Sequence, residues 1–318
     1  MVIRQALPSR MKALWALARF FLVTLACLGA GIAHAQTTDT SSAAALRARY
    51  GALQDRLSVN QFHRPLYLDS SETPAGVAGD IYALINHPFA TVGAALNSPG
   101  NWCDILILHL NTKYCRASTA GEGSVLDVSI GTKRGQPLDK AHQIVFAYRV
   151  AAQTPNYLQV RLNADQGPLS TSDYRIVLAA VPLEDGQTFI HLSYSYAYGL
   201  AGRLAMQAYL ATIGSDKVGF TVVGTQPDGR FLHIGGLRGV VERNTMRYYL
   251  AIEAYLGALS APPQARLEKR LHDWFAAIER YPRQLHELEQ SEYLDMKRRE
   301  HLRQQAATRA TSISAPGT

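Results

Sequence analysis

The sequence lacks the short motifs that mark the common catalytic and nucleotide-binding sites. It contains no G-x-S-x-G nucleophile elbow, no HExxH zinc motif, no P-loop and no G-x-G-x-x-G after a predicted strand. Each absence removes one class of function: elbow-type hydrolases, HExxH metalloproteases, P-loop nucleotide hydrolases and dinucleotide-dependent enzymes. From the sequence we therefore assign no catalytic residue, no metal ligand and no cofactor.

Cysteine is scarce, with three residues in 318. Cys27 lies in an apolar run near the start, which leaves Cys103 and Cys115 for the rest of the chain. No CxxC pair or His-x-x-x-His segment is present to complete a zinc site around them. We predict a Cys103–Cys115 disulfide, provided that the segment between them doubles back and brings the two sulfurs together.

Acidic residues are absent from the first 36 positions, where a basic start, Arg4 to Arg19, precedes the apolar run Phe20–Ile32. Ala33-His34-Ala35 fits a small-x-small cleavage site, so residues 1–35 are predicted to be a cleaved export signal. An uncleaved membrane anchor is the alternative, although the apolar run is short for a membrane span.

Without this segment the net charge falls from +7 to +3, because four basic residues lie within it. A charge this small does not indicate a nucleic-acid partner. No later segment is long and apolar enough to suggest a membrane span. We expect a periplasmic or secreted protein, the periplasm applying if the source is a Gram-negative bacterium.

Composition shifts and turn residues suggest five segments. After the signal we expect a linker and N-terminal helix (36–74), a main domain (75–259), a helical extension (260–307) and a disordered tail (308–318). The break before the main domain is the turn-rich stretch Ser70–Pro74, which follows a short strand at Arg64–Asp69. The segment Asn101–Leu110 stays ambiguous between a buried strand and a short helix.

Alternation of apolar and polar residues predicts an antiparallel sheet with one face toward an apolar interior. The pattern is strongest in four segments: 143–150, 157–164, 174–180 and 189–198. A helix at Gly199–Thr212 and a last strand at Val218–Val223 follow. The long segment Gly236–Leu259 has apolar residues three and four positions apart, which is typical of a helix packed along one face.

This order of elements resembles the helix-grip fold of the START-like superfamily. The features that carry the resemblance are GDIYALINHPFATVGAAL at the start, the strands of Gln143–Tyr198, and GLRGVVERNTMRYYLAIEAYL at the close. The resemblance implies an α+β fold in which a curved antiparallel sheet wraps around a long C-terminal helix, with extra helices at both ends here. It also implies a cavity that binds a lipid or another hydrophobic or amphipathic small molecule.

Candidate ligand-binding residues come from the sheet and the long helix. Tyrosine is frequent, with sixteen residues, and tyrosines on a concave sheet suit a partly polar cavity. On the long helix, Arg243 or Arg247 is expected to face the cavity mouth and hold a headgroup. The candidates are Tyr148, Tyr174, Tyr194, Tyr196, Tyr198, Arg243, Arg247 and Tyr248.

Two alternatives to a binding protein stay open. One is a cyclase- or hydrolase-like enzyme that uses tyrosine hydroxyls with Glu242 or Arg243 as acid/base groups. A purely structural explanation of Glu242 is an ion pair with Arg238 or Arg243 in its own helix. The other is an interaction module, since Gln264–Leu288 has an apolar stripe that could dock a partner or a second copy. Packing of that stripe against the domain itself is the simpler expectation. A peripheral contact with a membrane is also left open.

Overall fold

The computed structural model describes residues 43–121, 123–211 and 217–314. The predicted signal and the linker at 36–42 lie outside these ranges. No helix in the described part of the chain is both long and apolar enough to span a bilayer.

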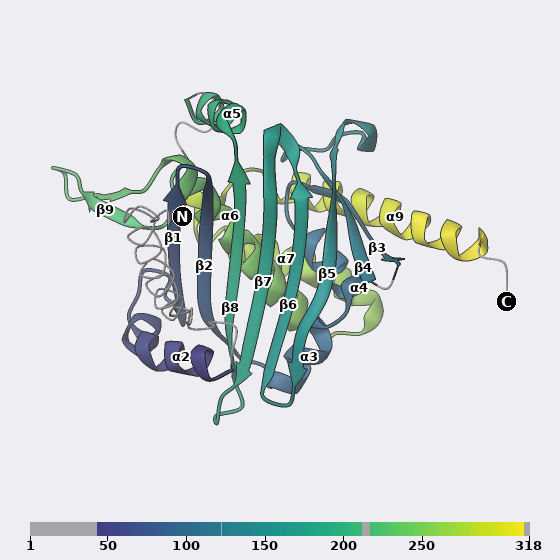
Figure 1. Cartoon of the computed structure of the whole chain (residues 1–318), viewed down its shortest axis with the longest axis horizontal. Helices are drawn as coiled ribbons and strands as arrows, with labels where there is room; N and C mark the ends of the chain where they lie inside the picture. Colours follow the sequence, from purple (N-terminus) through teal and green to yellow (C-terminus); the bar gives the residue numbers. More distant parts are fainter. Residues whose placement is uncertain (1–42, 122, 212–216, 315–318) are drawn as a thin grey trace, which may run out of the picture. The chain divides into compact units, whose positions relative to one another are not determined.

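One antiparallel sheet of eight strands dominates the structure (Figure 1). Its order is β1-β2-β8-β7-β6-β5-β4-β3, so the early hairpin β1–β2 joins the late strand β8 and the sheet stays open at β1 and β3. The strands are β1 (Leu66–Thr73), β2 (Gly76–Ile85), β3 (Thr112–Ala120), β4 (Gly123–Ile130), β5 (His142–Thr154), β6 (Tyr157–Gln166), β7 (Thr171–Pro182) and β8 (Thr188–Tyr198). The sheet thus begins before residue 75, where the sequence predicts the main domain to start.

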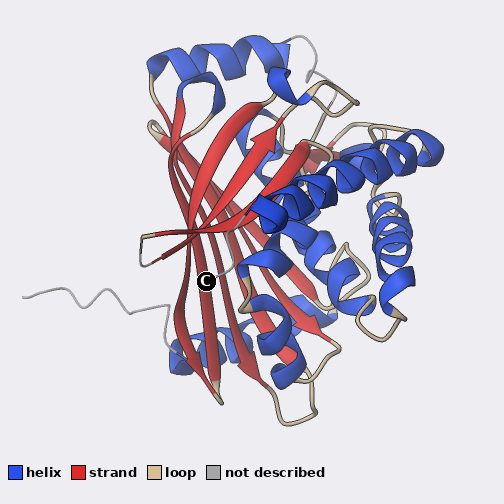
Figure 2. Cartoon of the chain, turned by 90° about the vertical axis from the view of Figure 1, so that its right-hand side faces the viewer, coloured by secondary structure: helices blue, strands red, loops and turns tan. Residues whose placement is uncertain are grey.

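The predicted alternation is confirmed along the central strands. In β5, Ile144, Phe146 and Tyr148 are buried, while Val145 between them is 55% exposed. The same period places every second residue of β6, β7 and β8 in one hydrophobic core. This inner face is covered by helices, most of which lie on one side of the sheet (Figure 2).

Helix α6 (Gly236–Gly257) is the long helix that the sequence predicts, and it packs against β1, β2 and β8. Its approach to β2 is close: a Cβ atom at Gly79 would lie 2.5 Å from Oγ1 of Thr245. Helices α4 and α7 pack elsewhere on α6, so α6 is buried on more sides than its apolar stripe alone indicates. The predicted helix-grip fold, an α+β sheet gripping a long helix, is confirmed.

The remaining helices pack around this core, except α2 (Ala43–Ser58), whose Leu46, Leu53 and Leu57 form a second cluster with residues such as Phe189. The others are α3 (Phe89–Leu96), α4 (Pro99–Leu106), α5 (Leu200–Ala211), α7 (Arg266–Ile278), α8 (Pro282–Leu285) and α9 (Gln290–Ser314). The ambiguous segment before β3 is therefore helical in α4. Cys103 of α4 is bonded to Cys115 of β3, with their Cα atoms 5.2 Å apart, so the predicted disulfide is confirmed.

Two sequence-based expectations about secondary structure are wrong. The predicted last strand, Val218–Val223, does not join the sheet; β9 (Val222–Thr225) pairs only with β10 (Phe231–His233). The reason is that the backbone N–H groups of Phe220 and Thr221 donate to the carboxylate of Glu242 instead of to a strand. The tail predicted to be disordered from residue 308 is helical to Ser314, the end of α9.

The apolar stripe at Gln264–Leu288 packs within the protein. Trp274 and Leu271 are fully buried, and the Trp274 ring stacks on Tyr293 of α9 at 4.9 Å. Pro282 begins α8 and so splits the helical run. Because its large residues are already covered, this stripe offers no docking face.

Candidate functional site

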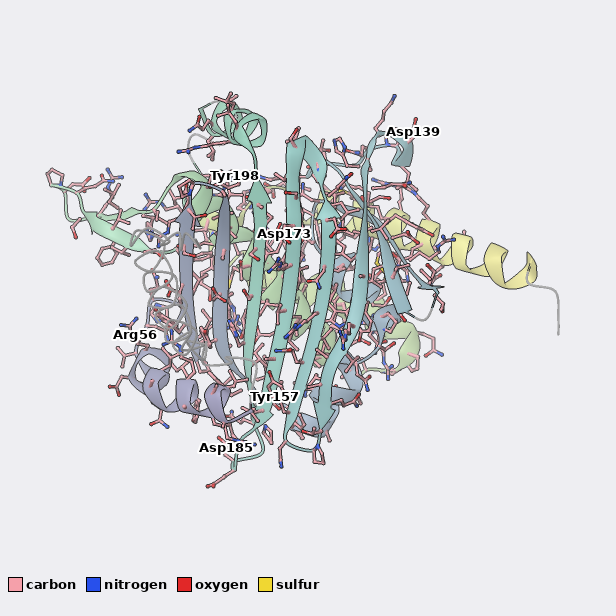
Figure 3. The ribbon with its side chains drawn as sticks, in the orientation of Figure 1. Arg56, Asp139, Tyr157, Asp173, Asp185 and Tyr198 are labelled. Carbon is pink, nitrogen blue, oxygen red and sulfur yellow. A yellow bond between two sulfur atoms is a disulfide. The ribbon has the colours of Figure 1, made fainter. Side chains whose placement is uncertain are left out.

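A pocket of ≈ 450 Å³ lies between the sheet and α6. Strands β4, β5, β7 and β8 line it on one side, and α6 contributes Val240, Arg243, Asn244, Arg247 and Tyr248 on the other. Exposed residues of two loops at one end of the sheet, Lys140 and Leu169, mark its mouth. Asp139, labelled in Figure 3, locates the first of these loops. The volume falls within the range of small-molecule sites.

The floor of the pocket is apolar and aromatic. Tyr174 stacks on Tyr196 with ring centroids 5.3 Å apart, and Tyr194 meets Tyr248 of α6 edge to face at 5.2 Å. Val128, Ile144, Phe146 and Ile176 complete this surface. Burial raises the pKa of all four tyrosines, so their hydroxyls are neutral hydrogen-bonding groups at ordinary pH.

Six of the eight candidate residues line this pocket: Tyr174, Tyr194, Tyr196, Arg243, Arg247 and Tyr248. The other two face the same side of the sheet but do not reach the pocket. The Tyr148 hydroxyl donates to the carbonyl of Leu96, beneath α3 and α4. Tyr198 ends β8 and donates to the carbonyl of Thr73 (Figure 3).

Positive charge gathers at one part of the pocket wall. Arg247 donates to Oε1 of Glu287 at 3.0 Å and to the carbonyl of Leu285, and Lys133 reaches the same Glu287 oxygen at 2.5 Å. Arg243 is buried close by. No Asp or Glu is among the described residues that line the pocket; Glu287, which lies outside the lining, pairs with both Lys133 and Arg247.

The electrostatics of this cluster lower the proton affinity of Lys133. Burial, together with the charges of Arg247 and Arg243, lowers its pKa to about 8, although Glu287 opposes the shift. For Glu287, burial favours the neutral acid, yet Arg247 and Lys133 hold its pKa below the ordinary value. Burying the charge of Lys133 costs free energy, so a second anion beside it, in addition to Glu287, would stabilise its charged form.

Sequence reasoning missed several polar residues of the lining, among them Lys133, His109 and Thr112. His109 and Thr112 differ from Lys133 in lacking a partner: both are buried, and among the described residues neither Nε2 of His109 nor Oγ1 of Thr112 has a hydrogen-bond partner. His109 stacks on Tyr248 at 4.9 Å. In the sequence it stands out only as a lone histidine between two cysteines, and the turn that brings it to Thr112 leaves no periodic signal.

Glu242 has a structural role in place of the intrahelical ion pair that the sequence suggests. Its carboxylate is fully buried and accepts hydrogen bonds from Ser70 Oγ, from the backbone N–H groups of Phe220 and Thr221, and from Thr221 Oγ1. These bonds tie β1 and the segment before β9 to α6. Glu242 does not line the pocket, which removes it from the acid/base groups available there.

The described ranges contain no group of three or more side chains that could hold a metal ion. What the pocket lining does offer is hydrogen-bond donors, positive charge and aromatic surface. These groups suit recognition of an anionic, partly apolar molecule.

Comparison with known proteins gives structural neighbours only. No family model matches the chain, and no curated protein matches it. A truncated norcoclaurine synthase from Thalictrum flavum aligns at 12% identity over 46% of this chain and 91% of its own, with a TM-score of 0.32. Ara h 8.0201 aligns at 12% identity over 61% and 99%, with a TM-score of 0.33. The Zhui aromatase/cyclase from Streptomyces sp. R1128 aligns at 11% identity over 64% and 93%, with a TM-score of 0.32. Identities and scores this low transfer no ligand or activity to this chain.

Proposed function

We propose that this helix-grip protein binds an amphipathic small molecule, such as a lipid, in the pocket between its sheet and α6. The observation that carries the proposal is the division of the pocket into an aromatic and aliphatic floor and a wall with Lys133, Arg243 and Arg247, with no carboxylate among the described lining residues. The floor favours an apolar body, and the cations favour an anionic headgroup.

The size of the pocket limits the ligand. At roughly 30 Å³ for each water-sized group, a volume of ≈ 450 Å³ holds on the order of 15 heavy atoms. A single acyl chain or a small aromatic acid fits this limit. A two-chain phospholipid would have to leave most of its atoms outside the mouth.

The test compares ligand binding by the unmodified protein with binding by a variant in which a larger side chain fills the pocket. Ile144 lines the pocket, whereas its neighbour Val145 faces outward from the same strand. We expect Ile144→Trp to abolish binding of single-chain lipids in native mass spectrometry, and the matched variant Val145→Trp to bind as the unmodified protein does. Failure of the unmodified protein to retain an apolar ligand or to bind any member of a lipid panel would overturn the proposal.

An enzymatic use of the pocket has less support. The tyrosines that line it have raised pKa values, and Glu242 is committed to four hydrogen bonds elsewhere. This leaves Arg243 as the only acid/base candidate from the sequence, and a guanidinium rarely exchanges a proton. Binding without turnover is therefore the function that the site supports best.

Export to the periplasm is part of the same proposal. It rests on the signal-like first 35 residues and on the Cys103–Cys115 disulfide, which suits an oxidising compartment. Sequencing of the N-terminus after expression in a Gram-negative host tests it. We expect a mature chain that begins at Gln36, and a chain that keeps its first 35 residues in the cytoplasmic fraction would contradict export.

A further inference from the structure

A tight turn at the start of β3 supplies the polar end of the pocket. The backbone N–H of Thr112 donates to the carbonyl of His109 at 3.1 Å, which brings the side chains of these two residues to the same end of the pocket lining. The turn is followed by Lys113, whose side chain is fully buried.

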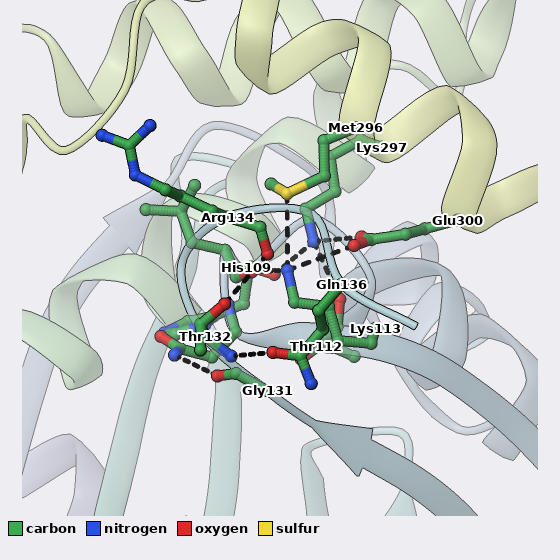
Figure 4. Close-up of polar contacts among 12 residues, drawn as sticks. His109, Thr112, Lys113, Gly131, Thr132, Arg134, Gln136, Met296, Lys297 and Glu300 are labelled. Carbon is green, nitrogen blue, oxygen red and sulfur yellow. Dashed lines mark hydrogen bonds and ion pairs between the residues drawn. The ribbon is translucent and has the colours of Figure 1, made fainter. Parts of the chain in front are cut away.

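Two buried lysines that are not part of the pocket lining bind this turn (Figure 4). Nζ of Lys297, on α9, donates to the carbonyls of His109 and Thr112 at 2.7 and 2.8 Å, and Nζ of Lys113 donates to the carbonyl of Leu110 at 2.8 Å. Glu300 bridges both ammonium groups, at 3.1 Å from Lys113 and 2.8 Å from Lys297. With its carbonyls engaged in this way, the turn is held rigidly while the side chains of His109 and Thr112 line the pocket.

The proton on His109 lies on the nitrogen without a partner. The backbone N–H of Asn111 donates to Nδ1 at 3.2 Å, so Nδ1 acts as an acceptor and carries no proton. Burial, with the nearby charges of Arg247, Lys297 and Lys113, holds the pKa of His109 well below its ordinary value. The ring is therefore neutral with its proton on Nε2, which makes Nε2–H a buried donor at the pocket wall.

We propose that the ligand is a single-chain amphipathic carboxylate whose oxygens accept hydrogen bonds from Nε2–H of His109 and Oγ1–H of Thr112, with Lys133 and Arg247 supplying the countercharge. This inference rests on the proposed function and adds the chemical class of the headgroup to it. A neutral donor, a hydroxyl and two cations in the lining of one pocket complement two carboxylate oxygens. An ammonium headgroup would be repelled by the positive charges of Lys133 and Arg247 there.

Matched ligands that differ only in the headgroup test the assignment. Dodecanoate, 1-dodecanol and dodecylammonium are titrated into the full protein at pH 7, below their micellar concentrations, by isothermal calorimetry. We expect dodecanoate to bind at least tenfold tighter than dodecanol, and dodecylammonium to bind more weakly than both. Equal affinities for the acid and the alcohol would overturn the headgroup assignment but leave the proposed function intact. If none of the three ligands binds, both the headgroup assignment and the proposed function are refuted.

Two substitutions locate the headgroup. His109→Phe keeps an aromatic ring against Tyr248 but removes Nε2–H, and Thr112→Val removes the hydroxyl at nearly constant volume. Each is expected to weaken dodecanoate binding by roughly tenfold and to change dodecanol binding by less than about twofold. Thr119→Val is the control, because Thr119 is an exposed residue on the same strand and does not line the pocket. A parallel loss for both ligands in the two variants would count against the assignment.

A measurement on the unmodified protein covers the case in which either variant folds poorly. In ¹⁵N-labelled protein, the Nε2–H signal of His109 should shift downfield when dodecanoate is added, because a charge-assisted hydrogen bond forms there. Dodecanol should leave this signal closer to its free position. No shift on saturation with dodecanoate would contradict the proposed contact.

Discussion

Raising the pH through the pKa of Lys133 should weaken binding of an amphipathic carboxylate. In the free protein this pKa is about 8, mainly because burial disfavours the ammonium group. Lys133 is therefore charged at pH 7 and neutral at pH 10. The carboxylate of the ligand stays ionised over the whole range, so the change in affinity reports on the protein.

The size of the effect follows from proton linkage. A hydrogen bond to a charged group contributes about 1.5 to 3 kcal/mol, which at about 1.4 kcal/mol per pKa unit raises the pKa of Lys133 in the complex by about one to two units. The direction follows from the number of bound protons. At a pH between the pKa of Lys133 in the free protein and its higher pKa in the complex, Lys133 is protonated in the complex but not in the free protein, so binding takes up a proton and weakens as the pH rises. Affinity should thus fall by roughly ten- to a hundredfold between about pH 8 and pH 10 and then level off.

Other ionisable side chains also lie near the pocket. Burial keeps the lining tyrosines neutral to high pH, and His109 is neutral throughout because its pKa is low. Lys140 lies at the mouth, and Lys217 lies beside Glu287. Lys297, which holds the His109 turn, also has a pKa lowered by burial to about 8.

A pair of variants separates these contributions. Lys133→Arg keeps its charge at every pH in the range and should give a flat affinity profile for dodecanoate from pH 7 to 10. Lys133→Met should bind dodecanoate weakly at all these pH values, and dodecanol should give a flat profile with every protein. A slope that persists in Lys133→Arg would refute the role of Lys133 and assign the titration to Lys297.

Three further predictions concern the framework that forms the pocket. Glu242→Gln should lower the free energy of unfolding in urea by about 2 to 3 kcal/mol, because a neutral amide oxygen would replace the charged oxygen that accepts from the backbone N–H groups of Phe220 and Thr221; an unchanged denaturation midpoint would contradict this. Gly79→Ala should cost about 1 to 3 kcal/mol through its clash with Thr245, and Thr245→Ala in the same chain should recover part of the loss, whereas additive losses would argue against the clash. Reduction of the Cys103–Cys115 bond should cost about 3 kcal/mol, the value for a loop of about this length, and calorimetry that gives one melting temperature with and without reductant would refute a stabilising role.

The sheet was predictable because a single physical rule governs its central strands. Residues such as Ile144 and Val145 alternate between the core and solvent, and this alternation is written directly in the sequence. The long helix was predictable for the same reason, since Gly236–Gly257 has one stripe that packs on the sheet. The strand order, with β2 beside β8, was not predicted, because no periodicity encodes which strands pair.

Elements held by polar contacts were not predictable in this way. Phe220 and Thr221 are apolar or β-branched and favour a strand, but Glu242 takes the hydrogen bonds that a strand would need. Helix α9 buries Lys297 and Glu300 beside Tyr293, Leu294 and Met296. A pattern search that treats charged residues as solvent-exposed therefore predicts a helix here but misses that its charged part is packed.

The position of the tyrosines shows where alternation stops being informative. It places Tyr148, Tyr194 and Tyr198 on the same inner face, and all three are buried there. Only Tyr194 lines the pocket, because α3 and α4 cover Tyr148 and β8 carries Tyr198 past the pocket to the end of the sheet. Which inward residues reach a cavity depends on what packs over the sheet, and the sequence of the strand itself does not contain this information.

The helical extension after Pro263 is the part of the chain that departs most from a compact helix-grip domain, and it also shapes the pocket. Lys297 of α9 holds the carbonyls of His109 and Thr112, while Glu287, just before α9, binds Arg247 and Lys133. Buried charges of this kind are costly unless each is paired, and here the paired groups are the ones that orient the pocket's donors. The extension therefore fixes the polar end of the pocket, whereas the sheet and α6 build its apolar floor.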